Sequence, residues 1–485
     1  MNAPIRRLSA LVAGLFLTLL LSTTWIQFFA AASINDQPGN RRTLLSTYTR
    51  ERGSILVSGE AIARSVESND ELVWDREYPM PRRYAHLTGY YSFVYGAGGG
   101  IEGAENSLLS GRSDTLFYRR VSDLLSGKRP VGASLELTID PAAQTAADEG
   151  LGDQRGAVVA LDPKTGAVLA MVSHPSYDPT DLASHDLEAV AENWTRLLED
   201  EADPLINRAI AGNLYPPGST FKLVTAAAAL ESGAYTQDST VPGPATLPLP
   251  GVEQPLPNHD GQPCGPNDET TLIRAMEISC NTAFASLGME MGAENLRAQA
   301  ARFGFGEPLT IPMRVTDSSV PDGMNEPNTA QAAIGQFDVR TTPLQMAMVA
   351  AGIGNGGVVM RPYLVSRVLG SQLQTIDEAL PEELSEAVST STARQLTTMM
   401  EAVVTSGTGQ AAQISGVEVA GKTGTAQHAE GAAPHAWMVT FAPADDPQVA
   451  VAVVVEDGGN AGNEAAGGSV AGPIARSVMQ AVLGS

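Results

Sequence analysis

The chain has 485 residues, of which 43% are hydrophobic and 17% are charged, so it is long enough for two or three globular domains. Its formal net charge of −24 at pH 7 argues against nucleic acid as a partner. The 2 cysteines and 6 histidines show no spacing typical of a metal site, so the sequence predicts neither a metal ion nor another cofactor.

The first predicted element is a membrane anchor. Residues 1–7 are basic, with Arg6 and Arg7 directly before an apolar run, and residues 8–32 carry no charged side chain. About 20 apolar residues span a bilayer, whereas a signal-peptide core has only about 7–15. We therefore expect 8–32 to be a single uncleaved transmembrane helix of the plasma membrane. By the positive-inside rule, residues 1–7 are then cytoplasmic and the rest is extracytoplasmic. The small residues at 30–32 resemble a cleavage site, so removal of the segment stays an alternative.

Residues 33–150 are expected to form a smaller, non-catalytic domain. Residues 50–56 indicate a strand entered through a turn, and 108–125 a helix broken by a short loop. The alternation of apolar and polar residues over 135–140 predicts a strand. No residue of this segment suggests catalytic chemistry, so we interpret it as a spacer or docking module.

The second predicted domain covers residues 151–485. Before it, Asp140 and Pro141 indicate the capped start of a helix. Two apolar runs around the turn Asp-Pro-Lys-Thr-Gly at 162–166 then predict a β-hairpin.

The rest of this domain alternates between helices and strands. Further helices are predicted over 272–284, 293–303, 382–405 and 473–483, with another after Gly335-Gln336, and antiparallel strands over 417–425, 436–441 and 448–456. A strand hairpin, helices, an antiparallel meander and a final helix indicate the α+β class, with helices covering a sheet.

The stretch from Tyr215 to Lys222 is the first candidate for chemistry. Two prolines at 216–217 resist helix formation and the Ala-rich sequence after Lys222 favours it, so a turn followed by a helix is predicted. Ser219 and Lys222 are then i and i+3, which places a hydroxyl and an amine on one face beside the free N–H groups of the helix start. These are parts of an acyl-transfer site. Taken alone, such a pair is more often a solvated helix face.

Two further short motifs follow Ser219. Ser279-Cys280-Asn281 falls at a helix end in a helix–loop–helix segment, and Lys422-Thr423-Gly424-Thr425 falls on or beside the first strand of the meander. The order Ser-x-x-Lys, Ser-x-Asn, Lys-Thr-Gly is the signature of penicillin-binding proteins and serine β-lactamases. A second Lys-Thr-Gly at 164–166 lies in the hairpin turn, and a second Ser-x-Asn at 33–35 lies beside the anchor. We interpret both as accidental.

The chain resembles the class B penicillin-binding proteins, membrane-anchored serine transpeptidases that cross-link peptidoglycan, over nearly everything after the anchor. No glycosyltransferase module precedes the spacer, unlike in class A. The matching segments, besides the three motifs, are Arg52-Gly53-Ser54-Ile55, Gly103 with Glu102 and Glu105, and Ala333-Ile334-Gly335-Gln336. The resemblance implies a serine β-lactamase/transpeptidase-like domain behind a pedestal or dimerisation-like domain.

The resemblance also implies roles in acyl transfer. Ser219 would be the nucleophile, and Lys222 the base, neutral because of burial and the positive charge of Lys422. Ser279 would bridge the two lysines and relay a proton to the leaving amine. The expected substrates are peptidoglycan stem peptides, a D-Ala-D-Ala donor and an amine acceptor, and β-lactams would trap Ser219 as an acyl-enzyme.

The remaining motif residues are expected to hold the substrate. Asn281 would hold Lys222 and a substrate amide, while Lys422, Thr423 and Thr425, with Gly424 between them, would bind the terminal carboxylate. The N–H groups of Ser219 and Thr425 would form the oxyanion hole. The alternatives are an ordinary helix-end serine at 279 and an ordinary strand threonine at 425.

The two cysteines are expected to form a disulfide. Cys280 is the middle residue of the second motif, Cys264 precedes it in a proline-rich loop, and an extracytoplasmic location permits oxidation. The bridge would close a loop of about 15 residues, worth roughly 3 kcal/mol by chain entropy. Two separate buried thiols are the alternative. His428 is expected to be a loop histidine and Trp437 a core residue.

Three other functions share these motifs. A class A β-lactamase needs a glutamate to activate water, for which Glu326 is the one faint candidate. A D,D-carboxypeptidase would use the same residues with water as acceptor. A catalytically idle scaffold would not need intact motifs. A β-lactam sensor would need a large cytoplasmic domain. The sequence therefore favours a D,D-transpeptidase of cell-wall growth or division, working with other cell-wall membrane proteins.

Overall fold

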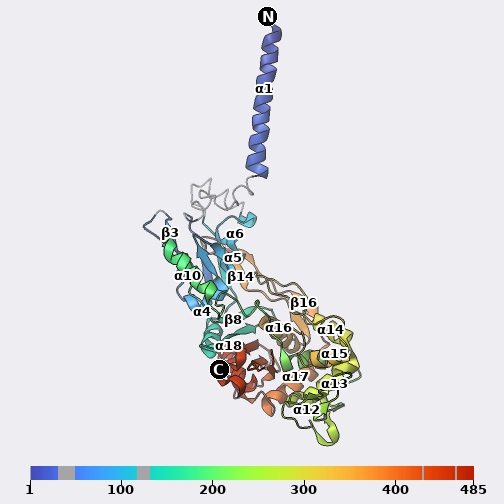
Figure 1. The fold of residues 1–485 in the computed structure, drawn as a ribbon. Coiled ribbons are helices and arrows are strands. Elements are labelled where there is room, and N and C mark those ends of the chain that lie inside the picture. Colours follow the sequence, from blue (N-terminus) through green and yellow to red (C-terminus); the bar gives the residue numbers. More distant parts are fainter. Residues whose placement is uncertain are drawn as a thin grey trace.

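The N-terminal helix stands clear of the globular part of the molecule (Figure 1). The computed structural model describes residues 2–30, 48, 50–70, 72–116, 131–428, 431–464 and 467–484. Helix α1 (Asn2–Thr24) continues as a π-helical turn, Trp25–Phe29. The apolar span Ala3–Phe29 has 27 residues, none of them buried, and is compatible by length and composition with a membrane anchor. The helix begins before residue 8 because helical hydrogen bonding continues through the basic residues.

The N-terminal sheet has six strands in the order β15-β14-β6-β1-β2-β3. They are β1 (Ile55–Val57), β2 (Glu60–Glu67), β3 (Trp74–Glu77), β6 (Ser134–Leu137), β14 (Val365–Leu369) and β15 (Thr375–Glu378). Strand β6 pairs in parallel with β1 and antiparallel with β14. Two strands of this sheet thus come from far along the chain. The expected strands at 50–56 and 135–140 are present but shorter. Residues 117–125 of the expected broken helix and the Ser-x-Asn at 33–35 lie outside the described residues.

A buried carboxylate organises the short elements that follow β3. These are α4 (Pro81–Thr88), β4 (Tyr90–Ser92), β5 (Gly96–Gly98), α5 (Gly100–Ala104), α6 (Asn106–Leu109) and η2 (Asp114–Leu116). Glu102, fully buried, accepts from Arg52 Nε at 2.5 Å and from Arg76 Nε at 2.6 Å.

Gly53 has no room for a side chain, since a Cβ would lie 1.8 Å from the Ala133 carbonyl oxygen. These contacts show what Arg52, Gly53 and Glu102 of the matching segments do in the fold.

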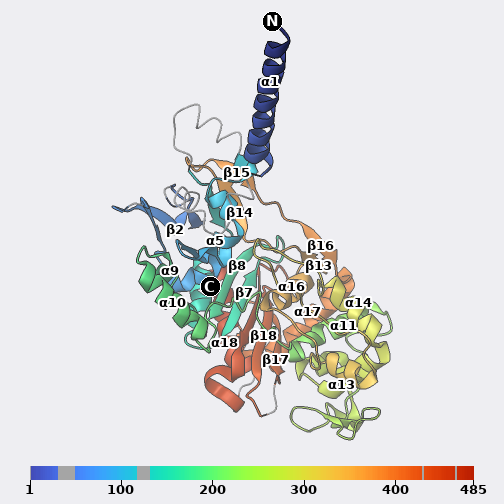
Figure 2. The same ribbon diagram turned by 45° about the horizontal axis from the view of Figure 1, so that its top comes forward.

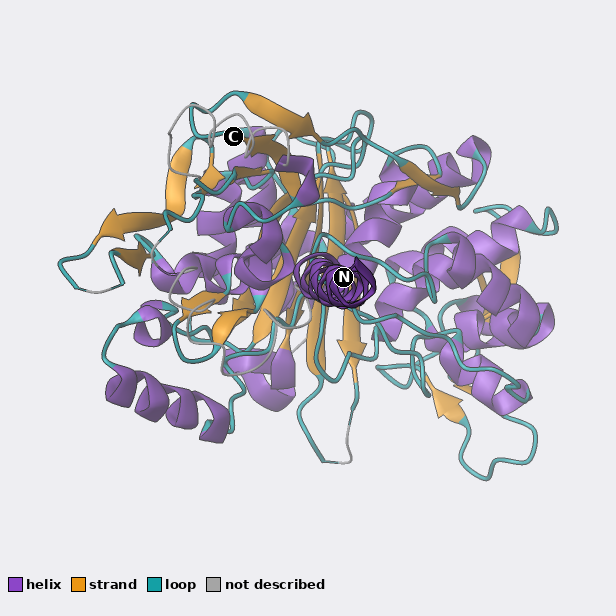
Figure 3. Cartoon of the chain, turned by 90° about the horizontal axis from the view of Figure 1, so that it is seen from above, coloured by secondary structure: helices purple, strands orange, loops and turns teal. Residues whose placement is uncertain are grey.

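The second sheet is the centre of the larger domain, with strand order β17-β18-β19-β7-β8. Its strands are β7 (Gly156–Leu161), β8 (Val168–His174), β17 (Ala420–Ala426), β18 (His435–Ala442) and β19 (Val449–Val455), all antiparallel to their neighbours. Helices α8 (Pro141–Leu151) and α18 (Gly467–Leu483) pack on one face, and α16 (Pro343–Gly354) on the other. Figure 3 shows helices on both sides of the central strands. The predicted hairpin and meander are confirmed.

The remaining helices lie mostly beyond the β17 edge of this sheet, where α11, α13 and α14 gather (Figure 2). The other elements of the chain are α9 (Thr180–Ala183), α10 (Leu187–Glu199), η3 (Gly218–Phe221), α11 (Lys222–Glu231), β9 (Thr240–Pro242), β10 (Thr246–Leu247), β11 (Leu256–Pro257), η4 (Pro266–Asp268), β12 (Glu269–Thr271), α12 (Leu272–Glu277), α13 (Asn281–Met291), α14 (Ala293–Arg302), α15 (Glu326–Ala332), β13 (Val358–Met360), β16 (Glu383–Glu386), α17 (Thr390–Thr405), η5 (Gln410–Ala412) and η6 (Glu456–Glu464).

One predicted helix is divided in two. The sequence predicts a helix over 272–284, but α12 ends at Glu277 and α13 begins at Asn281. Ser279 between them has φ +60°, a left-handed backbone that no helix continues through. The second motif therefore occupies the turn of a helix–loop–helix, as expected from its position.

Two other helix boundaries were wrong. Residues 383–386 of the predicted helix 382–405 form strand β16, which pairs with β13. Helix α18 begins at Gly467 rather than Pro473, which lies inside it. At Gly467 a Cβ would lie 2.2 Å from the Gly424 carbonyl oxygen, so only glycine lets the helix start this close to the sheet.

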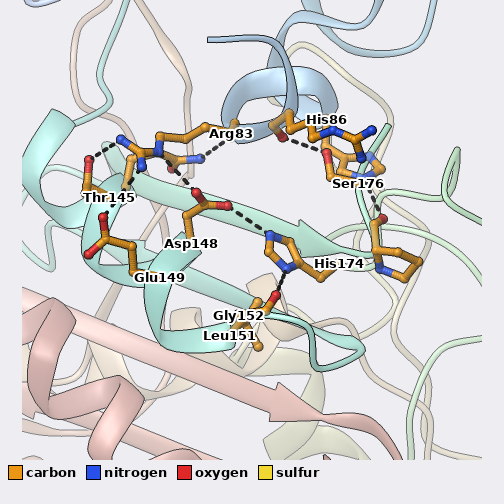
Figure 4. Close-up of polar contacts among 12 residues, drawn as sticks. Arg83, His86, Thr145, Asp148, Glu149, Leu151, Gly152, His174 and Ser176 are labelled. Carbon is orange, nitrogen blue, oxygen red and sulfur yellow. Dashed lines mark hydrogen bonds and ion pairs between the residues drawn. The ribbon is translucent and has the colours of Figure 1, made fainter. Parts of the chain in front are cut away.

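Polar contacts join the N-terminal region to the second sheet (Figure 4). Arg83 on α4 donates from Nε to Asp148 Oδ2 at 3.1 Å and from Nη1 to Thr145 Oγ1 at 3.0 Å. The other Asp148 oxygen lies 2.9 Å from Nε2 of His174, at the end of β8. Helix α8 carries Asp148 and packs on α18, although the predicted boundary at 150 assigns it to the N-terminal domain. That boundary stays a prediction.

Candidate active site

Ser219 lies in a tight turn rather than in the α-helix itself. The segment Gly218–Phe221 is a 3₁₀ turn, and α11 begins at Lys222. Ser219 is partly exposed, whereas its neighbours Gly218 and Thr220 are buried. The predicted turn followed by a helix is therefore confirmed. Ser219 lies in the 3₁₀ turn just before the α-helix rather than in the first turn of that helix.

Two glycines shape this turn. Gly218 has φ +53° and donates its N–H to the Gly335 carbonyl at 2.9 Å. Gly335 itself has φ +71°, and a Cβ there would lie 2.0 Å from the Gly218 carbonyl oxygen. Only glycine allows this approach. The contact explains why the segment 333–336, far from Ser219 in sequence, belongs to the matching motifs.

Two buried lysines meet at one serine hydroxyl. Lys222 and Lys422 are both 0% exposed. Lys222 Nζ donates to the Ser279 carbonyl at 2.7 Å, to Ser279 Oγ at 3.2 Å and to Asn281 Oδ1 at 2.7 Å. Lys422 Nζ donates to Ser279 Oγ at 2.9 Å and to the Thr423 carbonyl at 2.8 Å. Side chains from all three motifs thus form one cluster.

Burial and charge both disfavour a proton on Lys222. Removal from water lowers the pKa of Lys222 well below its ordinary value of 10.5, and the neighbouring Lys422 lowers it further. Burial also lowers the pKa of Lys422, to about 7. The expected direction and causes of the Lys222 shift are confirmed.

The expected contact between the serine and the amine is not formed. Within the described residues, Ser219 Oγ makes no hydrogen bond, and Lys222 Nζ is directed at Ser279 and Asn281 instead. A neutral amine has two N–H donors and one lone pair, so in that form Lys222 can donate to only two of these three acceptors at a time, and its lone pair is left to accept the Ser219 proton. Hydrogen bonds of a catalytic group often form only when substrate is present.

Strand β17 offers its outer edge to a ligand. It is the terminal strand of its sheet, so among the described residues one of its sides has no strand partner. Lys422 and Gly424 face η3, and a Cβ on Gly424 would lie 2.9 Å from Thr220 Cγ2. A side chain at 424 would push the strand away from the serine turn.

Thr423 and Thr425 point to the opposite face of β17. Thr423 Oγ1 lies 2.6 Å from Thr408 Oγ1, and Thr425 Oγ1 accepts from the Gly467 N–H at 3.4 Å. The strand is therefore flanked on one face by the amine of Lys422 and on the other by the hydroxyls of Thr423 and Thr425. The contact with Thr408 was not predicted, because a lone threonine in a turn carries no sequence signal.

The predicted disulfide is present. Cys264 and Cys280 are bonded, with Cα atoms 6.0 Å apart, and no free cysteine exists. The bridge ties the middle residue of the second motif to the proline-rich loop. The alternative of two separate thiols is wrong.

The other singled-out residues lie outside the lysine cluster. Trp437 is 0% exposed and donates from Nε1 to the Pro216 carbonyl at 3.2 Å, so it is a core residue as expected. His428 stacks on His435 and its Nε2 lies 3.1 Å from Asp457 Oδ1. Lys164 of the second Lys-Thr-Gly is in a surface turn, 2.5 Å from Asp446.

Two family models match this chain. The penicillin binding protein transpeptidase domain matches residues 156–480, and the penicillin binding protein A dimerisation domain matches residues 52–135. The first covers more than half of the chain. The chain therefore belongs to the penicillin-binding protein transpeptidase family.

Relatives with known names agree with this assignment. The chain is 44% identical to peptidoglycan D,D-transpeptidase PbpA of Mycolicibacterium smegmatis over 492 residues, covering 100% of this chain and 99% of the relative. It is 43% identical to the PbpA of Mycobacterium tuberculosis, with the same coverage. The ceftriaxone acyl-enzyme complex of penicillin-binding protein A from M. tuberculosis superposes with a TM-score of 0.87 at 42% identity, over 90% of this chain and 100% of that chain. Its penicillin G acyl-enzyme complex gives a TM-score of 0.85 at 42% identity, again over 90% of this chain and 100% of that chain.

Proposed function

We propose that this protein is a peptidoglycan D,D-transpeptidase that works through an acyl-enzyme on Ser219 and is inhibited by β-lactams. The observation that carries the proposal is the Ser279 hydroxyl between two buried lysines, 3.2 Å from Lys222 Nζ and 2.9 Å from Lys422 Nζ. A surface turn with the same residue types would bury neither amine.

In the first step, Ser219 Oγ attacks the carbonyl carbon between the two D-alanines. The neutral amine of Lys222 takes the serine proton, and the tetrahedral oxyanion is held by the N–H groups of Ser219 and Thr425. The C–N bond then breaks. The proton passes from Lys222 through the Ser279 hydroxyl to the leaving amine, and D-alanine departs.

In the second step, the amine of a neighbouring stem peptide attacks the ester carbonyl. The attacking amine loses a proton to Lys222, the ester bond to Ser219 breaks, and Lys222 returns that proton to the serine alkoxide, so that a new peptide bond cross-links the two stems. During the first step, before D-alanine departs, Lys422, Thr423 and Thr425 hold the donor carboxylate at the β17 edge, with Gly424 allowing close approach. Asn281 holds Lys222 and a donor amide. A substrate backbone can pair along this free edge as an added strand.

The location follows from the chemistry. Peptidoglycan is cross-linked outside the cytoplasm, so α1 would anchor the chain in the plasma membrane by a single pass, with the catalytic domain outside. Other cell-wall synthesis or division proteins of the membrane are the expected partners.

Labelling with a fluorescent penicillin tests the proposal. Wild-type protein is expected to become covalently labelled and Ser219→Ala is not, because the acyl bond forms at that oxygen. Ser232→Ala, at the other end of the same helix, is the matched control and is expected to label normally. Equal labelling of Ser219→Ala and wild type would contradict the assignment of the nucleophile.

The duplicated Lys-Thr-Gly allows a second control. Lys422→Met is expected to slow acylation, whereas Lys164→Met, which alters the surface copy, is expected to leave its rate unchanged. Incubation with stem peptides and separation of the products then distinguishes a cross-linked dimer from the free tetrapeptide of a carboxypeptidase.

A further inference from the structure

Asn258, in the proline-rich loop, is the buried centre of a hydrogen-bond network behind the second motif. It is 5% exposed, whereas the loop residues around it are exposed. Its Oδ1 accepts from the backbone N–H of Asn281 and of Thr282, both at 3.0 Å. Its Nδ2 donates to the carbonyls of Pro244 at 2.9 Å and Gln262 at 2.8 Å.

The acceptor role of Asn258 replaces a cap that helix α13 lacks. A helix start leaves its first N–H groups without partners, and a Ser, Thr, Asp or Asn at the N-cap normally accepts from them. The N-cap residue of α13 is Cys280, which makes no side-chain cap hydrogen bond and is bonded to Cys264. Asn258 therefore supplies from another loop what the middle residue of the motif cannot.

The position of this cap matters for the lysine cluster. The two capped N–H groups belong to Asn281, whose side chain accepts from Lys222 Nζ, and to the residue after it. On the other side of Cys280 is Ser279, held at φ +60°. A left-handed backbone at a non-glycine residue persists only when surrounding contacts hold it. The cap fixes the backbone two residues beyond Ser279, at Asn281.

We propose that Asn258 is a positioning residue for the transpeptidase reaction, which caps α13 in place of Cys280 and so holds Ser279 and Asn281 against Lys222. This inference rests on the roles proposed above for the second motif. It assigns a function to a loop residue outside the three motifs.

The test measures the second-order rate of acylation by a fluorescent penicillin, as a function of pH, in full-length protein. Asn258→Ala is expected to acylate about 10- to 100-fold more slowly, since small displacements of catalytic groups have effects of this size. Asn258→Asp keeps the acceptor of the cap but loses the donors to the Pro244 and Gln262 carbonyls, so it is expected to recover the rate only in part. Gln254→Ala changes an exposed amide of the same loop and is expected to match wild type.

A double-mutant cycle shows whether Asn258 acts through the motif. Because Asn258 works by placing Asn281, the rate losses of Asn258→Ala and Asn281→Ala are expected to be far less than multiplicative when combined. A wild-type rate in Asn258→Ala or independent losses in the cycle would each overturn the inference. Thermal unfolding of every variant shows that the compared proteins are folded. Labelling of Ser219→Ala would instead overturn the proposed function itself.

Discussion

At the scale of single residues, the site depends on how two buried amines share one hydroxyl. Both lysines lie out of water, and two ammonium groups beside one serine would repel each other strongly in such a place. Lys222 therefore gives up its proton more readily than an ordinary lysine. The proposed base and the proposed carboxylate-binding residue are thus coupled through their charges.

The coupling predicts a shift in pH dependence. Acylation requires neutral Lys222, so its rate falls as the pH drops below the pKa of that amine. Lys422→Met removes a positive charge that helps to lower this pKa, so the pKa rises and the acid limb of the rate profile is expected to move to higher pH. The profile is measured with a fluorescent penicillin between pH 5 and pH 10, with Lys164→Met as control. An acid limb that stays in place would contradict the charge coupling.

The left-handed backbone at Ser279 predicts that two variants without the hydroxyl differ in stability but not in activity. Both Ser279→Gly and Ser279→Ala remove the bridging hydroxyl, and both are expected to acylate slowly. Glycine adopts φ +60° without steric cost, whereas alanine does not, so the Gly variant is expected to unfold with about 1 kcal/mol more free energy than the Ala variant. Urea denaturation compares the two. Equal stabilities would show that the turn relaxes without its hydroxyl.

At the scale of elements, Glu102 ties helix α5 to two points of the N-terminal sheet. It accepts from Arg52, before β1, and from Arg76 on β3. Burial opposes its charge, but the two arginines outweigh this and hold the pKa of Glu102 below its ordinary 4.5. The carboxylate is therefore ionised in the folded protein.

Removing this charge is expected to be costly. Glu102→Gln leaves two arginines poorly paired in a buried place and is expected to lower the free energy of unfolding by about 3–5 kcal/mol. Chemical denaturation measures the loss. The exposed pair Arg64–Glu77 is the control, since Glu77→Gln is expected to change stability by no more than about 1 kcal/mol. Similar effects of the two variants would contradict the importance of burial.

At the scale of the whole molecule, the two sheets are connected twice. Strands β14 and β15 leave the larger domain and complete the N-terminal sheet. Asp148 on α8 joins Arg83 of α4 to His174 of β8 (Figure 4). The N-terminal region is therefore built into the catalytic part rather than linked by a single connection.

The contacts of Asp148 between the N-terminal region and the second sheet predict that the protein becomes less stable in acid. Burial raises the pKa of Asp148, but the hydrogen bonds from His174 and Arg83 lower it more, so the folded value lies below the ordinary 3.8. A depressed carboxyl pKa stabilises the fold fully above the unfolded value, and this stabilisation is lost as the pH falls through the folded value. Asp148→Asn is therefore expected to lower stability at pH 7 and to flatten its decrease below about pH 4. Unfolding curves across this range check it; parallel curves would contradict the prediction.

Local chemistry explains what could be predicted from the sequence. The spacing of Ser219 and Lys222, the alternation in the meander and the turn at 162–166 depend on neighbours within a few residues, so their structure follows from local preferences. The order of the three motifs indicated acyl transfer, and the position of Cys280 beside the site indicated the disulfide that the structure contains.

The rest depended on contacts between distant parts of the chain. The break at Ser279 contradicts a local helix signal, and it exists because Lys222, Lys422 and the loop around Asn258 converge on it. No short-range pattern marks that loop as a cap. The sequence by itself thus determined which chemical groups the protein brings to its reaction. Only the tertiary structure decided how they meet, because strained turns and buried charges are stable only when segments far apart in sequence surround them.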